Sequence, residues 1–197
     1  MKKTITILAC LFLTGIGFYG CKKGPNDPFI SIWSRKHRLT GDWTISSGTQ
    51  SSTSGGSITT TTWSGSTVTR TAGGSSMIGT GSMKLSIVKD GTYTFTQNIT
   101  WTTTPSFISN YTETGTWNWT GRVGALKNKE QIVLSCLSST TLNGSSSTVD
   151  TYTGADAPVT LYNIDELKNK TLVLKNDGTS VSGGTITTDS NTMTFTQ

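Results

Sequence analysis

Polar and apolar residues alternate at a spacing of two over most of the chain from Gly41 to Gln197. Threonine and serine fill the polar positions, and aromatic or aliphatic residues fill the others. This period is typical of β-strands, whose successive side chains point to opposite faces, and threonine tolerates the exposed face of a strand. The pattern predicts many short strands joined by tight turns with no helices between them, and therefore an all-β antiparallel barrel or sandwich.

Residues 84–101 carry the clearest version of this pattern. Leu85 and Ile87 alternate up to Asp90-Gly91, a pair that tolerates the positive φ of a tight turn, and the apolar residues from Tyr93 to Trp101 resume the same parity. We therefore expect a β-hairpin here.

Similar alternation predicts the remaining strands at residues 41–46, 57–71, 111–119, 131–137, 148–153, 159–162, 171–175, 179–187 and 192–197. The pairs Asn143-Gly144 and Asp177-Gly178 are expected to form turns between strands. Residues 46–57 have almost no apolar side chain and are expected to form a long loop. In residues 111–119, Trp117 and Trp119 share one face, and the threonines between them share the other.

The first 39 residues differ in character from the rest. Met1, Lys2 and Lys3 precede an apolar run that ends near Phe18, which is shorter than the about 20 residues of a membrane-spanning helix. We expect residues 1–20 to be a cleavable signal peptide. Residues 21–28, with two prolines and an Asn-Asp pair, are expected to be a linker, and residues 29–39 a short helix at the start of a domain that covers residues 29–197.

Gly20-Cys21 at the end of the apolar run resembles the bacterial lipobox, in which the cysteine thiol receives a diacylglycerol and the amine a further acyl chain such as palmitate. This resemblance implies that Cys21 tethers the mature protein to a membrane without spanning it. Lys22 stands where an aspartate retains lipoproteins in the inner membrane, so the resemblance implies the outer membrane, facing the periplasm. The alternative is an ordinary signal peptide followed by a chance cysteine.

The net charge of +5 belongs to the N-terminal segment. Residues 1–39 hold seven Lys/Arg and one Asp, a net of +6, which leaves −1 for the remaining residues. A nucleic-acid partner is therefore not expected, because it requires a cationic face on the domain, whereas basic residues beside an acyl anchor suit anionic lipid headgroups. Cys136 would be the one thiol left in the mature chain, and its apolar strand predicts a buried small side chain.

The residues that support catalysis or metal binding are sparse. The single histidine, His37, lies among Arg35, Lys36 and Arg38 with no acidic partner nearby, so a hydrolytic triad is not expected. Zinc would need several His or Cys ligands, so a zinc site is not expected. The Asp165-Glu166 pair, considered for calcium, is expected to be a solvated turn. Folding could still bring two carboxylates together, for example Glu113 and Glu130. We expect no catalytic residue, no metal and no cofactor.

Large aromatic side chains on the predicted strands could line a ligand cavity, because eight strands close around space for side chains or one small ligand. The candidate lining residues are Tyr93, Phe95, Trp117 and Trp119. The expected function is non-catalytic binding of a small, partly apolar molecule, with Trp117 or Trp119 reporting an apolar probe. The alternative is a structural or interaction protein of the cell envelope whose barrel is filled; its protein partner is not identified.

The segment Gly41-Asp42-Trp43, after the helix predicted at residues 29–39, resembles the Gly-x-Trp opening of lipocalins. Further segments are similar to bacterial lipoproteins with a lipocalin-like domain, namely residues 91–95, 115–119, 126–130, 162–167 and 172–174. The resemblance implies a small antiparallel barrel, a short helix leading into its first strand, and a Trp43 ring that closes the narrow end. Lipocalins place an arginine late in the barrel over this ring, whereas the last arginine here is Arg122.

Overall fold

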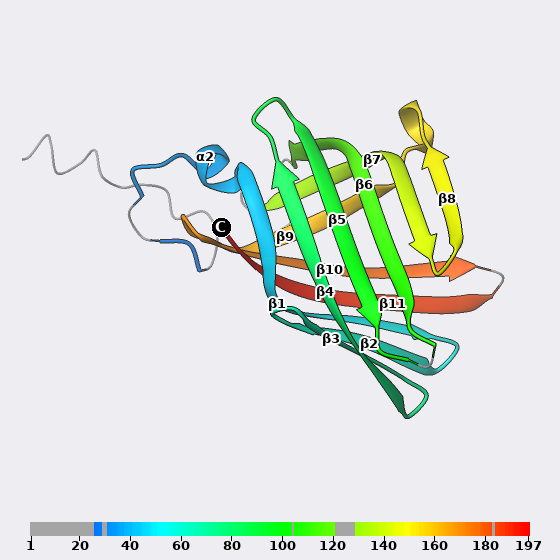
Figure 1. The fold of residues 1–197 in the computed structure, drawn as a ribbon. Coiled ribbons are helices and arrows are strands. Elements are labelled where there is room, and N and C mark those ends of the chain that lie inside the picture. Colours follow the sequence, from blue (N-terminus) through cyan, green and yellow to red (C-terminus); the bar gives the residue numbers. More distant parts are fainter. Residues whose placement is uncertain (1–25, 29–30, 104, 121–128, 183) are drawn as a thin grey trace, which may run out of the picture.

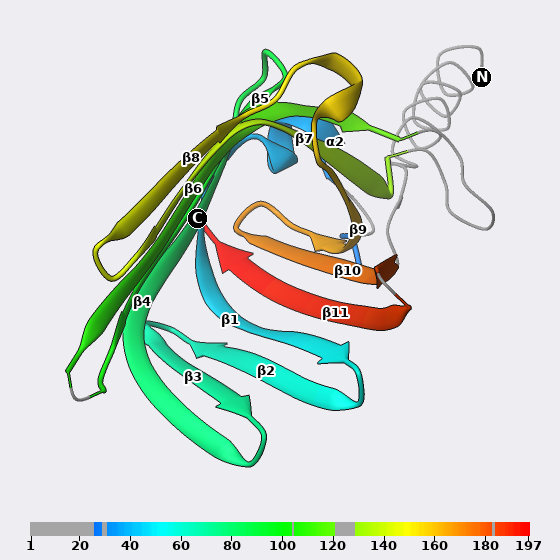
Figure 2. The same ribbon diagram turned by 90° about the vertical axis from the view of Figure 1, so that its right-hand side faces the viewer.

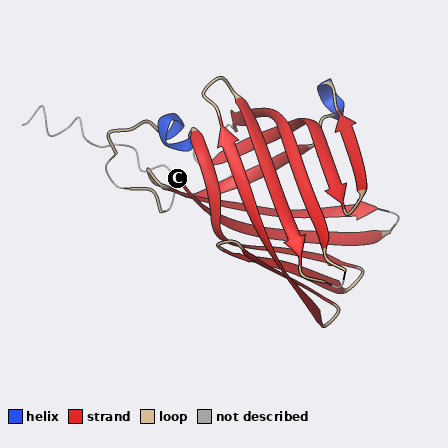
Figure 3. Cartoon of the chain, viewed as in Figure 1, coloured by secondary structure: helices blue, strands red, loops and turns tan. Residues whose placement is uncertain are grey.

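The protein is an antiparallel β-barrel preceded by one short helix, as Figure 3 shows. The computed structural model describes residues 26–28, 31–103, 105–120, 129–182 and 184–197. The predicted all-β fold class is confirmed. The predicted signal peptide and Cys21 lie outside the described residues.

The elements follow in chain order as α2 (Arg35–Leu39), β1 (Gly41–Ser54), β2 (Ser57–Ser64), β3 (Thr67–Ala72), β4 (Ser75–Ile87), β5 (Thr92–Trp101), β6 (Phe107–Trp119), β7 (Gln131–Asn143), β8 (Ser146–Thr151), a 3₁₀ turn (Gly154–Asp156), β9 (Val159–Leu167), β10 (Thr171–Ser182) and β11 (Thr185–Thr196). Every pair of neighbouring strands is antiparallel. Among the described residues, no helix is long and apolar enough to cross a bilayer.

Ten strands form a closed ring in the order β6-β5-β4-β3-β2-β1-β11-β10-β9-β7, with β7 paired back to β6. Near helix α2 the ring is narrower, because residues 41–44 of β1 pair directly with residues 84–87 of β4 and bypass β2 and β3. Eight strands therefore surround this closed end, where α2 lies (Figure 1). The β2–β3 hairpin and β8 widen the opposite half, called here the open half.

The open half consists of two walls, with β8 on one and β10 on the other (Figure 2). Strand β8 pairs only with β7, and residues 176–182 of β10 pair only with β11 within the described part of the chain. The hydrogen-bonded wall is therefore interrupted between β8 and β10. Within the described residues, each of these two strands presents an unpaired edge.

The apolar core occupies the closed end and the floor of the open half. Trp43, Trp63, Leu85, Tyr93 and Phe195 are among its largest buried side chains. The hairpin predicted at residues 84–101 is confirmed, and its apolar residues of one parity point inward as expected. Burial of these side chains supplies the main favourable free energy of folding.

The loop predicted at residues 46–57 is wrong: β1 continues through Ser54, and only Gly55 and Gly56 form the turn. Strand pairing with β11 on one side and β2 on the other satisfies this polar backbone, so the segment needs no apolar side chains to be ordered. The single strand predicted at 57–71 is instead two strands separated at Gly65. The turn predicted at Asp177-Gly178 is also wrong, because both residues pair with β11 within β10.

The helix predicted at residues 29–39 is shorter in the structure, where α2 covers only Arg35–Leu39. It begins after Ser34, whose side-chain oxygen accepts a hydrogen bond from the His37 backbone N–H at 3.1 Å. This N-cap satisfies one of the backbone donors that a helix start leaves without a partner. Phe29 and Ile30 of the predicted helix lie outside the described residues.

Candidate functional site: a cavity in the open half of the barrel

A cavity of about 220 Å³ lies inside the barrel, where the apolar core gives way to polar side chains. Both walls contribute to its lining, which consists of Gln50, Phe95, Gln97, Tyr111, Glu113, Leu134, Thr160, Tyr162 and Met193. The volume corresponds to about seven waters at the ~30 Å³ that each occupies in the liquid. This space fits a small organic molecule with both apolar and polar groups.

Glu113 is the charged group of this cavity, and two tyrosines fix its carboxylate. The Tyr111 hydroxyl donates a hydrogen bond to Glu113 Oε2 at 2.5 Å, and the Tyr93 hydroxyl donates to Glu113 Oε1. Each carboxylate oxygen has a second lone pair and can accept one more hydrogen bond. The carboxylate is therefore oriented by the protein and still able to bind a donor in the cavity.

A glycine allows Tyr93 to reach this position. Gly115 of β6 lies opposite Tyr93 of β5, and a Cβ atom at Gly115 would fall 2.0 Å from the Ser135 carbonyl oxygen and 2.9 Å from the Tyr93 ring. The register of β6 and β7 also shifts beside Gly115, leaving Leu137 as the extra residue of a β-bulge. The missing side chain at Gly115 therefore leaves room for both the Ser135 carbonyl and the Tyr93 ring.

The environment of the cavity favours neutral hydroxyl and thiol groups around the single carboxylate. Burial raises the pKa of Tyr93 and of Tyr111 well above the ordinary value, and the hydrogen bonds to Glu113 raise it further. Burial also raises the pKa of Tyr162 to about 12, with a smaller contribution from the negative charge of Glu113. The pKa of the Cys136 thiol is raised mainly by burial and then by Glu113, so this thiol is a poor nucleophile.

Strand register extends the polar lining beyond the cavity. Phe95, Glu113, Ser139 and Asp150 are paired across β5, β6, β7 and β8, so their side chains point to the same face. On the other wall, Gln50 pairs with Asn191, and Asn191 pairs with Asn176. The wall with β8 therefore carries a row that includes two carboxylates, and the wall with β10 carries a row of amides.

The residues that the sequence suggested as lining a ligand cavity occupy different places in the barrel. Phe95 lines the cavity, and the Tyr93 hydroxyl donates a hydrogen bond to the lining residue Glu113. Trp117 is buried in the core towards the closed end, where its indole N–H donates to the Val88 carbonyl oxygen at 2.8 Å and its ring contacts Trp119 edge-on at 5.7 Å. Neither Trp117 nor Trp119 is among the residues that line the cavity. Trp43 is fully buried at the closed end.

The structure does not bring Glu113 and Glu130 together. Ser139 of β7 pairs with Glu113, and Glu130 precedes Ser139 by nine residues, which corresponds to roughly 30 Å along a strand. Asp165 and Glu166 lie in β9 instead of the expected turn, and they pair with Lys175 at 3.2 Å and Lys168 at 3.0 Å. In the described ranges, no three His, Cys, Asp or Glu side chains gather as a set of metal ligands.

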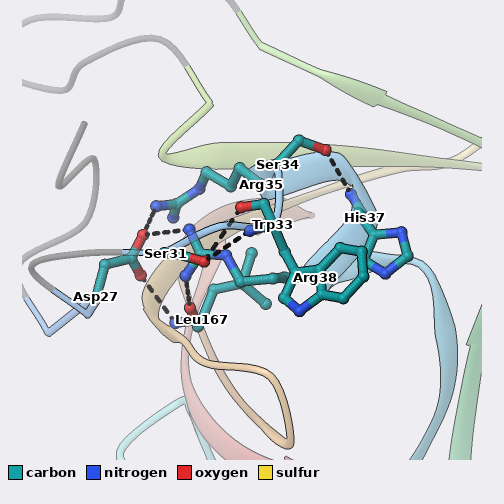
Figure 4. A network of polar contacts seen from close by, with 8 residues as sticks. All are labelled: Asp27, Ser31, Trp33, Ser34, Arg35, His37, Arg38 and Leu167. Carbon is teal, nitrogen blue, oxygen red and sulfur yellow. Dashed lines mark hydrogen bonds and ion pairs between the residues drawn. The ribbon is translucent and has the colours of Figure 1, made fainter. Parts of the chain in front are cut away.

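The closed end is tied together by a buried charge cluster (Figure 4). The Asp27 side chain is fully buried; it pairs with Arg35, lies 3.6 Å from Arg38 and accepts a hydrogen bond from the Leu167 backbone N–H at 2.9 Å. Arg38 in turn donates to the Leu167 carbonyl oxygen. This cluster attaches the segment before α2 to the end of β9. Asn26 extends the attachment by donating its side-chain amide to Asp165 at 3.2 Å.

A larger groove of about 730 Å³ lies outside the barrel, beside α2 and the β4–β5 turn. Trp33 and His37 stack on its edge with ring centroids 4.3 Å apart. It is open to solvent, and its carboxylate, Asp42, is exposed and accepts a hydrogen bond from the Ser86 hydroxyl at 2.6 Å, whereas two tyrosine hydroxyls fix Glu113 inside the barrel. We therefore regard the barrel cavity as the better candidate site.

Comparison of the chain with protein-family models, curated proteins and solved structures finds no match.

Sequence reasoning did not identify Glu113, Gln50 or Tyr162 as lining residues. For Glu113 a signal was present, because the parity that places Trp117 inward places Glu113 inward as well. Gln50 lies in the segment expected to be a loop, so no face could be assigned to it. Tyr162 could be placed on a strand, but only the pairing of β7 with β9 brings it near β6.

Proposed function

We propose that this protein is an exported lipoprotein, anchored through Cys21, whose lipocalin-like barrel binds a small molecule in its open half without converting it chemically. The observation that carries the proposal is the cavity of about 220 Å³ enclosed by both walls of the barrel. Its lining combines apolar surface from Phe95, Leu134 and Met193 with oriented polar groups, which is the usual composition of a ligand site.

Binding can be tested by calorimetric titration of the full chain in non-ionic detergent with benzyl alcohol, which has one ring and one hydroxyl. We expect a saturable signal that is absent from a detergent blank. Thr160→Phe places a ring in the cavity and should abolish the signal. Thr62→Phe adds the same ring at an exposed, outward-facing position of β2 and should leave binding unchanged. No saturable binding to the wild-type chain would refute the ligand-carrier proposal.

The anchor is supported by the lipobox-like Gly20-Cys21 and by the basic residues that flank it. Detergent phase partitioning of the wild type and Cys21→Ala tests it in cells that process lipoproteins. The wild type should enter the detergent phase, whereas the variant should remain uncleaved or be released, because it lacks the thiol that receives the lipid. Identical partitioning would exclude acylation at Cys21. From the flanking residues, we propose the periplasmic face of the outer membrane as the location.

An interaction role in the cell envelope is the second candidate, favoured by the unpaired edges of β8 and β10. Strand β8 is exposed along its whole length, so an extended segment of another protein could pair with it. This role would take first place if the wild-type barrel binds no small probe.

A further inference from the structure

We infer that the barrel cavity selects a small organic cation, with an ammonium group against Glu113 and an apolar body among the aromatic and aliphatic lining residues. This inference rests on the proposed function, because it names the ligand class for the same cavity.

Among the described residues, Glu113 has no positively charged partner. Within the described ranges, the ion pairs involve Asp27, Asp165 and Glu166, and Glu113 makes none. Its two hydrogen-bond donors are neutral tyrosine hydroxyls. A partly buried carboxylate is stabilised most strongly by an opposite charge at hydrogen-bond distance, and an ammonium group supplies both the charge and donors for the remaining lone pairs.

Aromatic rings line the same cavity as Glu113. Phe95 and Tyr111 lie with ring centroids 6.2 Å apart, and Tyr162 belongs to the same lining. Cations are attracted to the faces of aromatic rings, and this attraction grows when the site is desolvated. Leu134 and Met193 offer apolar contact for the uncharged body of the ligand. A neutral ligand would use the apolar surface but not the charge of Glu113.

The charges around the mouth of the open half also favour a cationic ligand. By strand register, the charged side chains on the inner face are Glu113, Asp150 and Asp189 against Arg70, which is a net of −2 for the described strands. Asp150 is two strands from Glu113, about 10 Å away at the usual strand spacing. A concave surface with one dominant sign of charge concentrates ligands of the opposite sign.

The test compares 2-phenylethylammonium with 2-phenylethanol, which have the same ring and the same number of non-hydrogen atoms but differ in charge. Calorimetric titration of the full chain in non-ionic detergent should give a Kd at least tenfold lower for the ammonium compound. Raising the salt concentration should weaken binding of the ammonium compound and leave binding of the alcohol unchanged.

Glu113→Gln should remove the preference, weakening the ammonium compound at least tenfold and changing the alcohol by less than twofold. Glu166→Gln is the matched control, since it removes the same charge from the outer face of β9 and should leave both affinities unchanged. If Glu113→Gln does not fold, the preference of the wild type and its salt dependence decide the question.

Two outcomes overturn the inference. If the wild type binds both probes equally, or if Glu113→Gln keeps the ammonium preference, the cavity binds ligands without selecting a cation, and the proposed function stands. If neither probe binds the wild type, the cation inference and the ligand-binding function both fail.

Discussion

The Trp43 indole N–H donates a hydrogen bond to the Leu39 carbonyl oxygen at 2.8 Å, which joins the first barrel strand to the end of helix α2. Leu39 and Trp43 are both fully buried. A helix end leaves carbonyl groups without intrahelical partners, and a buried one needs a donor from elsewhere. Trp43 supplies that donor while its ring fills the closed end of the barrel.

Trp43→Ala should therefore lower the free energy of unfolding by roughly 3–5 kcal/mol, the range for truncating a large buried aromatic side chain. Denaturant melts of the purified protein measure this loss. Trp33→Ala is the control, because Trp33 is 46% exposed and its truncation should stay within about 0.5 kcal/mol of the wild type. A loss below about 1 kcal/mol at Trp43 would mean that its ring is not needed to close the barrel.

Asp27→Asn should destabilise the protein by about 3–5 kcal/mol, because it leaves the buried guanidinium groups of Arg35 and Arg38 without their carboxylate. Glu166→Gln provides a comparison at the surface, since its partner Lys168 is half exposed and the pair should contribute at most about 1 kcal/mol. Chemical denaturation of both variants tests the difference. Equal, small losses would show that the Asp27 cluster does not hold the N-terminal segment in place.

Gly115→Ala should cost several times more stability than Gly178→Ala. The added methyl group at Gly115 would overlap the Ser135 carbonyl and the Tyr93 ring, whereas a Cβ at Gly178 meets no atom within 4 Å. We expect about 1–3 kcal/mol or more at Gly115, as for overpacked cores, and little change at Gly178. Thermal melts compare the two, and equal melting temperatures would argue against the tight β6–β7 contact.

The protein should lose stability in alkaline solution between about pH 10 and 12. The pKa of Tyr162 is raised by burial from about 10 to about 12, so the folded state holds this proton more tightly than the unfolded state. The resulting stabilisation is complete below pH 10 and is lost as the pH rises through the folded-state value. Tyrosinate absorbance measures the ionisation of tyrosine, and circular dichroism recorded at the same pH values should show unfolding in this window. Tyr162→Phe should make the loss of stability with pH shallower. The same pH dependence in this variant as in the wild type would contradict the role of Tyr162.

The sequence could predict those strands that have one apolar and one polar face. Period-two alternation placed Leu85, Tyr93 and Trp117 inward, because burial acts on every second residue of a strand. It failed between Ser46 and Ser54, where both faces are polar and only pairing with β2 and β11 keeps the chain extended. The turn predicted at Asp177-Gly178 failed for a similar reason, because pairing with β11 overrides the turn propensity of these two residues.

The candidate site was harder to predict because it depends on contacts between distant segments. The pairing of Tyr93 with Gly115 and the bulge at Leu137 determine how Tyr93 reaches Glu113, and neither has a local signature. Local parity suggested Phe95 as a lining residue but could not separate it from Trp117, which lies deeper in the core. The depth of a residue along the barrel depends on strand register, which parity alone does not provide.

The burial of Asp27 determines how the barrel would sit on a membrane. Five residues lie between Cys21 and Asp27, and the six residue steps from one to the other span at most about 20 Å in an extended chain. Lipid on Cys21 would therefore keep the base of the barrel beside the bilayer, with the mouth directed into the surrounding water. If the anchor and the ligand site are as proposed, the barrel would collect its ligand from solution and return it there, and it would be poorly placed to extract molecules from the membrane that holds it.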